Sequence, residues 1–237
     1  MSYKITATIV DSVLFFWQRI PGLVIHNLSK ARMLKIIFWH LNVDQMQGDY
    51  LEFGVAHGHS MRAAAIAERS SFSRKIGVPH IKRNLYGFDT FDQFISTSEL
   101  DIHGTWKGDK FSASLEKVQR RFKKNKNVTL VQVDANTLTT KEGNLSKETY
   151  GLNQGAAIIL LDMDLYAPTL AALIWCRELL QQGTFIILDE YYSFKGREDL
   201  GEARAVNEFL KLYPEIILRD FCTYGAGGKV FIVNFSN

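Results

Sequence analysis

The chain has 237 residues, enough for one substantial core, and we expect one domain over residues 47–237 after a helical extension over residues 1–46. Its 28 basic and 25 acidic residues leave a net charge of +3, which is too small to indicate nucleic acid or another polyanion as a partner. A hydrophobic content of 46% excludes a disordered chain. The cysteines, Cys176 and Cys222, lack metal-ligand or redox spacing, which favours a reducing, cytoplasmic setting.

The N-terminal extension is predicted to be helical over residues 5–20 and 30–46, with a break at Pro21 and Gly22. Charged residues interrupt both apolar stretches, so neither provides the roughly 20 apolar residues that a transmembrane helix needs. The N-terminus also lacks the pattern of a signal peptide. We expect amphipathic helices that cover the sheet or a partner in a homodimer, with a membrane-surface role as the less favoured alternative.

From Tyr50 onward, short apolar runs alternate with helical patterns, which is typical of a parallel, doubly wound α/β sheet. Residues that are apolar at successive positions suit strands buried on both faces. The last two runs are joined only by residues 222–228, so a hairpin is expected and the last of seven strands should run antiparallel. The expected strands cover residues 50–53, 85–88, 128–133, 156–161, 184–188, 215–221 and 229–235, and the expected helices cover residues 60–70, 112–124, 168–181 and 201–212.

The first strand leads through Gly54 and Gly58 into the helix that begins near Ser60. Glycine permits a tight turn and a close approach by a ligand, and the start of the helix offers free N–H groups. Plain strand-to-helix geometry explains the same glycines equally well. The turn alone therefore leaves cofactor binding and simple chain reversal as equal alternatives.

Acidic residues follow the next strands, at the sheet edge where open α/β sheets bind their ligands. Asp89 follows the second strand and would accept hydrogen bonds from a ribose, with a helix cap or turn as the alternative. Asp134 follows the third strand and would reach an adenine amino group, with capping nearly as favoured. Together these positions strengthen the prediction of a nucleotide-like cofactor.

Four further acids, Asp162, Asp164, Asp189 and Glu190, follow two strands that are expected to be neighbours. Carboxylates crowded at one point repel unless a cation or shared protons offset their charge. Hard oxygen ligands suit Mg²⁺, so a magnesium site is predicted here. The alternative is structural, with Asp164 capping the helix that begins near Pro168 and Glu190 pairing with Arg197 or Lys195.

Residues 95–111 are predicted to form a loop or lid that contains His103 and Trp106. His103 would serve as a general base if this loop closes over the site, although a lone loop histidine is more often solvated. Trp106 would cover an acceptor or pack onto its own domain.

Four elements in this order resemble the macrocin O-methyltransferase family, and the resemblance covers about residues 45–235. They are residues 48–55 with Gly58, residues 87–91, residues 162–169 and residues 183–191. The family consists of S-adenosylmethionine-dependent class I methyltransferases with a Rossmann-like sheet, several of which act on sugar hydroxyls in natural-product biosynthesis.

The resemblance implies a cofactor turn at Glu52, Gly54 and Gly58, a ribose contact at Asp89, and a divalent cation among three acids. The chain departs from the family at Met163, where glycine is usual, and at Glu190, where aspartate is common. The predicted residues for S-adenosylmethionine are Glu52, Gly54, Val55, Gly58, Ser60, Asp89 and Asp134, and those for Mg²⁺ are Asp162, Asp189 and Glu190.

These observations predict in-line transfer of a methyl group from S-adenosylmethionine to a hydroxyl of a small molecule or sugar. Mg²⁺ would orient the acceptor and lower the hydroxyl pKa, while Asp162, Asp164 or His103 removes the proton. Two alternatives stay open. One is a nicotinamide-dependent oxidoreductase, which is disfavoured because the first turn lacks a three-glycine spacing. The other is a non-catalytic cofactor-binding partner subunit.

Overall fold

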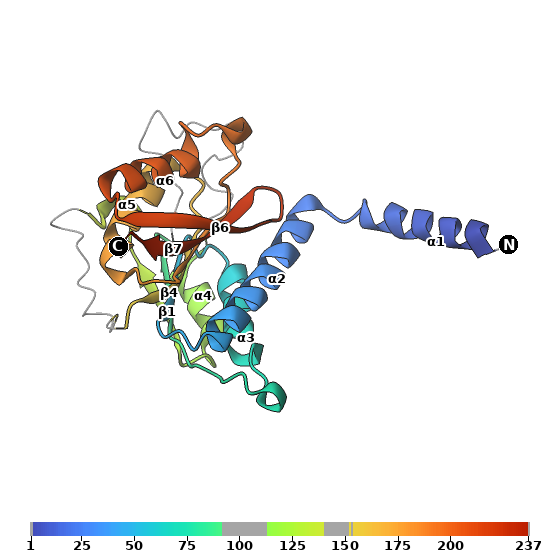
Figure 1. Cartoon of the computed structure of the whole chain (residues 1–237), viewed down its shortest axis with the longest axis horizontal. Helices are drawn as coiled ribbons and strands as arrows, with labels where there is room; N and C mark the ends of the chain where they lie inside the picture. Colours follow the sequence, from blue (N-terminus) through green and yellow to red (C-terminus); the bar gives the residue numbers. More distant parts are fainter. Residues whose placement is uncertain (1, 92–112, 140–151, 153, 237) are drawn as a thin grey trace.

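A computed structural model describes residues 2–91, 113–139, 152 and 154–236, with side chains from residue 10 onward. Its centre is a seven-stranded sheet in the order β3-β2-β1-β4-β5-β7-β6 (Figure 1). The predicted doubly wound α/β fold is therefore confirmed. The strands are β1 (Asp49–Phe53), β2 (Leu85–Asp89), β3 (Val128–Gln132), β4 (Ala156–Leu161), β5 (Phe185–Leu188), β6 (Ile216–Tyr224) and β7 (Gly228–Phe235).

The strands from β1 to β5 pair in parallel, whereas β7 runs antiparallel to both of its neighbours, β5 and β6. The predicted antiparallel last strand is thus confirmed. The sixth strand extends beyond its predicted end at Phe221 as far as Tyr224. The register of the β6–β7 pair shifts between Asp220 and Cys222, and the strands then go on pairing in the new register as far as Tyr224 and Gly228. The hairpin turn consequently reaches the carboxyl edge of the central strands.

Helices cover both faces of the sheet (Figure 1). One face packs against α2 (Gly22–Val43), α3 (His59–Ser70) and α4 (Leu115–Phe122), and the other against α5 (Tyr166–Cys176) and α6 (Gly201–Leu212). Strands β1, β4 and β5 are buried along their whole length, which explains the unbroken apolar runs of β4 and β5.

Helix α2 begins at Gly22, directly after Pro21, and not at residue 30 as the sequence pattern predicts. Proline is compatible with a helix start, and nothing in the next turns breaks the helix. The earlier start adds residues 22–29, which include the buried His26 and join it to the buried Lys30 in one helix. This extra length carries α2 to the carboxyl edge of the sheet.

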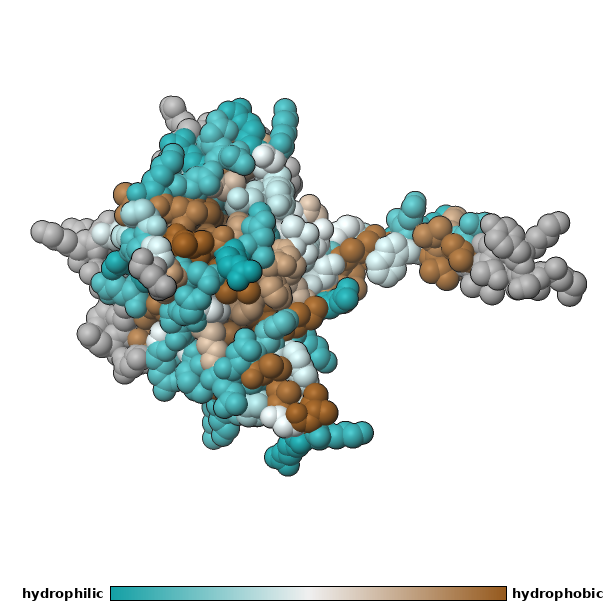
Figure 2. All heavy atoms as spheres, viewed as in Figure 1, coloured by the Kyte–Doolittle hydropathy of each residue, from teal (hydrophilic) through white to brown (hydrophobic). Residues whose placement is uncertain are grey.

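Helix α1 (Ser2–Trp17) projects away from the sheet (Figure 1). Figure 2 shows apolar surface on this projection, and the described side chains of Leu14, Phe15, Phe16 and Trp17 are all at least half exposed. Covering of the sheet therefore falls to α2, while α1 leaves apolar surface open. Within the part of the chain that the structure describes, no helix has both the length and the apolar character needed to cross a bilayer.

Gly54, directly after β1, is where the backbone approaches a neighbouring chain segment most closely. Its φ is +92°, and a Cβ placed there would lie 1.9 Å from the backbone oxygen of Asp162. Because backbone atoms cannot move aside as a flexible side chain does, glycine is required at this position.

We expect Gly54→Ala to lower the free energy of unfolding by at least about 2 kcal/mol, through backbone strain and this contact. The matched control is Gly22→Ala, because a Cβ at Gly22 meets nothing within 4 Å. That variant should stay within about 1 kcal/mol of wild type. Urea unfolding measures both, and equal stability of the two variants would contradict the close approach at Gly54.

Candidate active site

Three residues with left-handed backbone conformations lie just after β1, β2 and β4. They are Ala56, Phe91 and Asp164, with φ values of 44°, 50° and 65°. Such conformations cost energy in non-glycine residues and tend to gather at functional sites. Their position at one edge of the sheet marks this edge as the candidate site.

The turn after β1 has the predicted strand–turn–helix form, but two of its polar side chains point into the protein. Glu52 is fully buried and accepts hydrogen bonds from Ser60 Oγ, at 2.6 Å, and from the Tyr50 hydroxyl. Burial raises the pKa of Glu52 to about 8. Val55 is buried in the core as well. The side chains of Glu52, Val55 and Ser60 thus stabilise the turn, and their contact with a cofactor stays a prediction.

Gly58 ends this turn as the N-cap residue of α3, with φ of +74°. A Cβ there would lie 2.9 Å from the ring of Phe122 on α4. Packing against α4 and against the backbone of Asp162 therefore explains both glycines of the turn, whether or not a ligand also approaches them.

Asp89 at the end of β2 joins two loops of the candidate site. Its Oδ2 accepts a hydrogen bond from the backbone N–H of Ala56 at 2.7 Å, and its Oδ1 accepts one from that of Phe91 at 2.8 Å. Oδ1 also accepts a hydrogen bond from the Thr90 hydroxyl at 3.4 Å. A carboxylate oxygen has two lone pairs, so Oδ2 retains acceptor capacity. The bond to Phe91, two residues on, is what the turn alternative predicts, and the ribose contact stays a prediction.

Asp134 has a local role in this structure. It is exposed, and its Oδ1 accepts a hydrogen bond from the backbone N–H of Asn136 at 2.9 Å. This bond caps the short 3₁₀ helix Ala135–Thr137. The capping alternative is what the geometry shows, and the adenine contact stays a prediction.

A lysine lies between two of the predicted metal ligands. Lys30 Nζ donates to Asp162 Oδ2 at 2.7 Å and to Asp189 Oδ2 at 2.6 Å. Lys30 is only 4% exposed, and Asp189 only 3%. Although burial lowers the pKa of Lys30, the charges of Asp162 and Asp189 raise it above its ordinary value. Lys30 is therefore a fixed ammonium ion inside the acid cluster.

Asp189 has two more hydrogen-bond donors. His26 lies one turn before Lys30 on α2, and its Nε2 is 2.9 Å from Asp189 Oδ2. The Tyr224 hydroxyl donates a hydrogen bond to Asp189 Oδ1. His26 Nδ1 accepts a hydrogen bond from the backbone N–H of Ala226 at 3.1 Å, which assigns the ring proton to Nε2. Burial alone would raise the pKa of Asp189, but His26 and Lys30 hold it below its ordinary range.

The remaining acids lie beside this ion pair. Carboxylate oxygens of Asp162, Asp164 and Glu190 lie within 4.8 Å of one another. Burial and the charges of Asp162 and Asp189 raise the pKa of Asp164 to about 8. Burial and the charge of Asp189 raise that of Glu190 well above its usual value. With its pKa of about 8, Asp164 holds a proton near neutral pH. Burial and the charge of Asp189 raise the pKa of Asp162 only to about 6, because Lys30 opposes them.

Glu202 adds a fifth carboxyl group from the first turn of α6. It accepts a hydrogen bond from the backbone N–H of Glu190 at 3.0 Å, while its Oε1 finds no partner among the described residues. The N-cap residue of α5 is Leu165, so Asp164 does not cap that helix. The acids thus gather at one point, as the strand pattern predicts, whereas Lys30, His26 and Glu202 are additions from helices.

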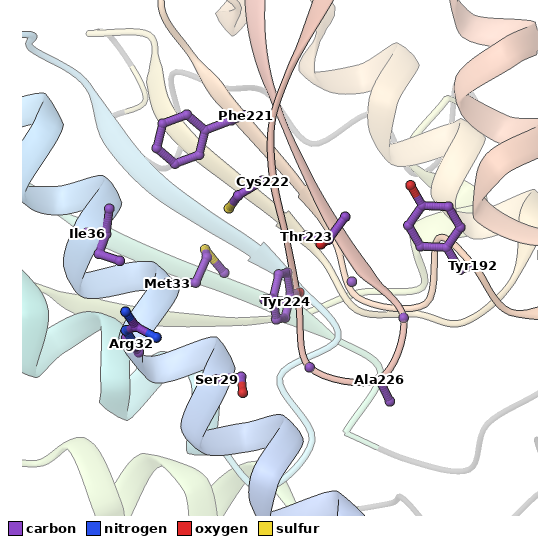
Figure 3. Close-up of a pocket in the computed structure, with 13 residues that line it drawn as sticks. Ser29, Arg32, Met33, Ile36, Tyr192, Phe221, Cys222, Thr223, Tyr224 and Ala226 are labelled. Atoms are coloured by element: carbon purple, nitrogen blue, oxygen red, sulfur yellow. The ribbon is translucent and has the colours of Figure 1, made fainter.

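A groove of about 660 Å³ lies between α2 and the β6–β7 hairpin. Figure 3 shows Ser29, Arg32 and Ile36 of α2 facing Phe221 and Cys222 across it. Tyr224, which also lines the groove, connects it to the acid cluster through its bond with Asp189. His103, which is also predicted as a general base, lies outside the described residues, and so does Trp106.

Comparison with known proteins places this geometry in context. The family model described as macrocin-O-methyltransferase (TylF) matches residues 20–212. Similar solved structures include the O-methyltransferase NovP, at 18% identity and a TM-score of 0.60, covering 85% of this chain and 78% of that one. The calicheamicin methyltransferase CalS11 has 19% identity and a TM-score of 0.59, and the match covers 85% of this chain and 77% of that one. A putative O-methyltransferase from Klebsiella pneumoniae has 17% identity and a TM-score of 0.52, and the match covers 96% of each chain. A comparison with curated proteins finds no match. At these identities the structures show the shared fold.

The buried carboxyl group of Glu52 generates a pH-dependent stability. Because its folded pKa of about 8 exceeds the ordinary value of 4.5, its stabilising contribution is complete below pH 4.5 and is lost as pH rises toward 8. Glu52→Gln has the same shape and does not ionise. Between pH 4.5 and pH 8, the free energy of unfolding of wild type should therefore fall, relative to that of this variant, by up to roughly 1.4 kcal/mol per pH unit.

Urea unfolding from pH 5 to pH 8 measures the difference. Glu198→Gln, at an exposed position, serves as the control and should follow wild type throughout. Parallel pH curves for Glu52→Gln and wild type would show that Glu52 does not carry a proton in the folded protein.

Proposed function

The chain belongs to the macrocin-O-methyltransferase family, and from that premise we propose that its carboxyl-edge site methylates a hydroxyl of a small molecule or sugar. Family membership makes it an S-adenosylmethionine-dependent O-methyltransferase and replaces the nicotinamide alternative. The acceptor class and the residue roles are the proposed parts. The observation that carries them is the position of Asp162, whose backbone touches the glycine turn at Gly54.

The turn after β1 and Asp89 are proposed to hold the cofactor. Gly54 and Gly58 shape the turn, and the N-terminus of α3 presents backbone N–H groups to the methionine end. Asp89 would accept a hydrogen bond from the ribose with the lone pair of Oδ2 that Ala56 leaves free. Because the sulfonium is already activated, these residues mainly position the methyl group and exclude water.

Asp162 is proposed as the general base. It stands at the end of β4, and its side chain is 23% exposed, so an acceptor hydroxyl has access to it. With a pKa of about 6 it is ionised at neutral pH, whereas Asp164, with a pKa of about 8, holds its proton. Asp162 is therefore better suited than Asp164 to receive the hydroxyl proton. His103 stays a predicted alternative.

The predicted magnesium ligands do not fit a divalent cation in this arrangement. One oxygen of each of two predicted ligands, Asp162 Oδ2 and Asp189 Oδ2, is bonded to the Lys30 ammonium. Asp189 is also bonded to His26 and Tyr224. A proton on Asp164, whose pKa is about 8, relieves part of the remaining repulsion. No step of the proposed reaction therefore passes through Mg²⁺.

The enzyme is also proposed to be a cytoplasmic homodimer. The exposed apolar side chains of α1, Phe16 and Trp17 among them, suit a homodimer contact with a second copy. Both cysteines are free thiols, which supports the predicted cytoplasmic location. Natural-product biosynthesis remains the proposed context, because the structurally similar CalS11 is described as an enzyme in calicheamicin biosynthesis.

Asp89→Ala should weaken binding of S-adenosylmethionine at least tenfold, because the ribose loses its acceptor and the first turn loses its link to β2. Asp44→Ala is the control, because Asp44 is exposed at the C-terminal end of α2, and this variant should change affinity less than threefold. Calorimetry measures both variants, with thermal unfolding to verify that they fold. An affinity for Asp89→Ala equal to wild type would remove the ribose assignment.

Asp162→Asn should lower kcat at least 100-fold with little change in S-adenosylhomocysteine affinity, because the amide cannot accept the hydroxyl proton. Wild-type turnover should fall as the pH drops through about 6, where Asp162 becomes protonated. Release of S-adenosylhomocysteine with an acceptor found by screening sugars and phenols measures both. Full turnover by Asp162→Asn would exclude Asp162 as the base.

A further inference from the structure

Helix α2 sends two side chains to the carboxyl edge of the sheet. His26 and Lys30 are four residues apart, so they lie on the same side of the helix one turn apart. Both reach Asp189 Oδ2, at 2.9 and 2.6 Å, although 163 and 159 residues separate them from it in sequence. A helix outside the parallel strands and loops thereby contributes to the acid cluster.

The sheet register explains why one ammonium serves two carboxylates. Leu161 pairs with Leu188 in the parallel strands β4 and β5, so the next residues, Asp162 and Asp189, emerge side by side. Lys30 Nζ lies within 2.7 Å of an oxygen of each. Two carboxylates bridged in this way are arranged as they would be around a shared metal ion, with an ammonium at the bridging position.

Lys30 is held in this position by its surroundings. Met33 and Leu34, on the next turn of α2, are buried in the core. His26 is held from the other side by Ala226, in the turn of the β6–β7 hairpin. Rotation or sliding of α2 would break these contacts together, so the ammonium is part of the folded scaffold.

We propose that Lys30 is the resident cation of this site, taking the place between Asp162 and Asp189 that a divalent ion would otherwise hold. Its fixed positive charge offsets the repulsion of the two carboxylates and aims Asp162 at the cofactor turn. Unlike a metal ion, it cannot dissociate. Lys30 is thus a positioning residue that acts through Asp162, and this role rests on the proposed methyl-transfer site.

Mn²⁺ titration followed by electron paramagnetic resonance tests the proposal directly. Lys30→Met removes the ammonium and leaves two carboxylates side by side, so this variant should bind one Mn²⁺ at least tenfold more tightly than wild type. Lys30→Arg keeps the charge and should match wild type. Lys35→Met, at an exposed position on the same helix, is the matched control and should also match wild type.

Equal Mn²⁺ affinity of wild type and Lys30→Met, including no binding by either, would overturn the proposal. A second measurement does not depend on the stability of the variant. Wild-type crystals soaked in MnCl₂ should show no anomalous density between Asp162 and Asp189. Density there, with Lys30 displaced, would overturn the proposal.

These outcomes are separate from those of the proposed function. Calorimetry of wild type with S-adenosylmethionine and the acceptor screen test methyl transfer without reference to Lys30. A protein that binds no S-adenosylmethionine would contradict the proposed function, while its Mn²⁺ measurements would still decide what occupies the position between the two carboxylates.

Discussion

The structure depends on the buried ion pairs that Lys30 makes with Asp162 and Asp189. Neighbouring strands bring the two carboxylates together, and their repulsion inside the protein requires a compensating charge. Removing one partner of a buried pair typically costs about 3–5 kcal/mol, because the other charge stays buried. The same contacts fix α2 over the sheet, so the covering helix and the candidate site are stabilised together.

This arrangement connects the fold to its chemistry. Asp162 follows β4, and its backbone lies against Gly54, so the proposed base and the proposed cofactor turn are held by direct contact. Asp89 links that turn to β2. Each loop of the site is thus tied to a neighbouring strand end, which provides the preorganisation that methyl transfer needs.

Much of the fold is predictable from the sequence because short, mainly apolar runs recur, as in Ala156–Leu161, and each run is followed by a glycine or an acid. The gathering of Asp162, Asp164, Asp189 and Glu190 follows from that pattern. The contribution of Lys30 does not follow from it, because a charged residue in an apolar helix indicates only an exposed position. The partners of Lys30 also lie more than 130 residues away in the sequence. The late predicted start of α2 also separates His26 from Lys30. Local capping, as at Asp134, leaves no signal that distinguishes it from ligand binding.

A crystal structure of the wild-type protein with S-adenosylhomocysteine tests the central claim most directly. We predict that the sulfur lies beside the Gly54 turn, that the ribose hydroxyls contact Asp89, and that the Asp162 carboxylate faces the sulfur while still bonded to Lys30. Binding of the cofactor elsewhere, or an Asp162 side chain turned away from the sulfur and separated from Lys30, would contradict the account.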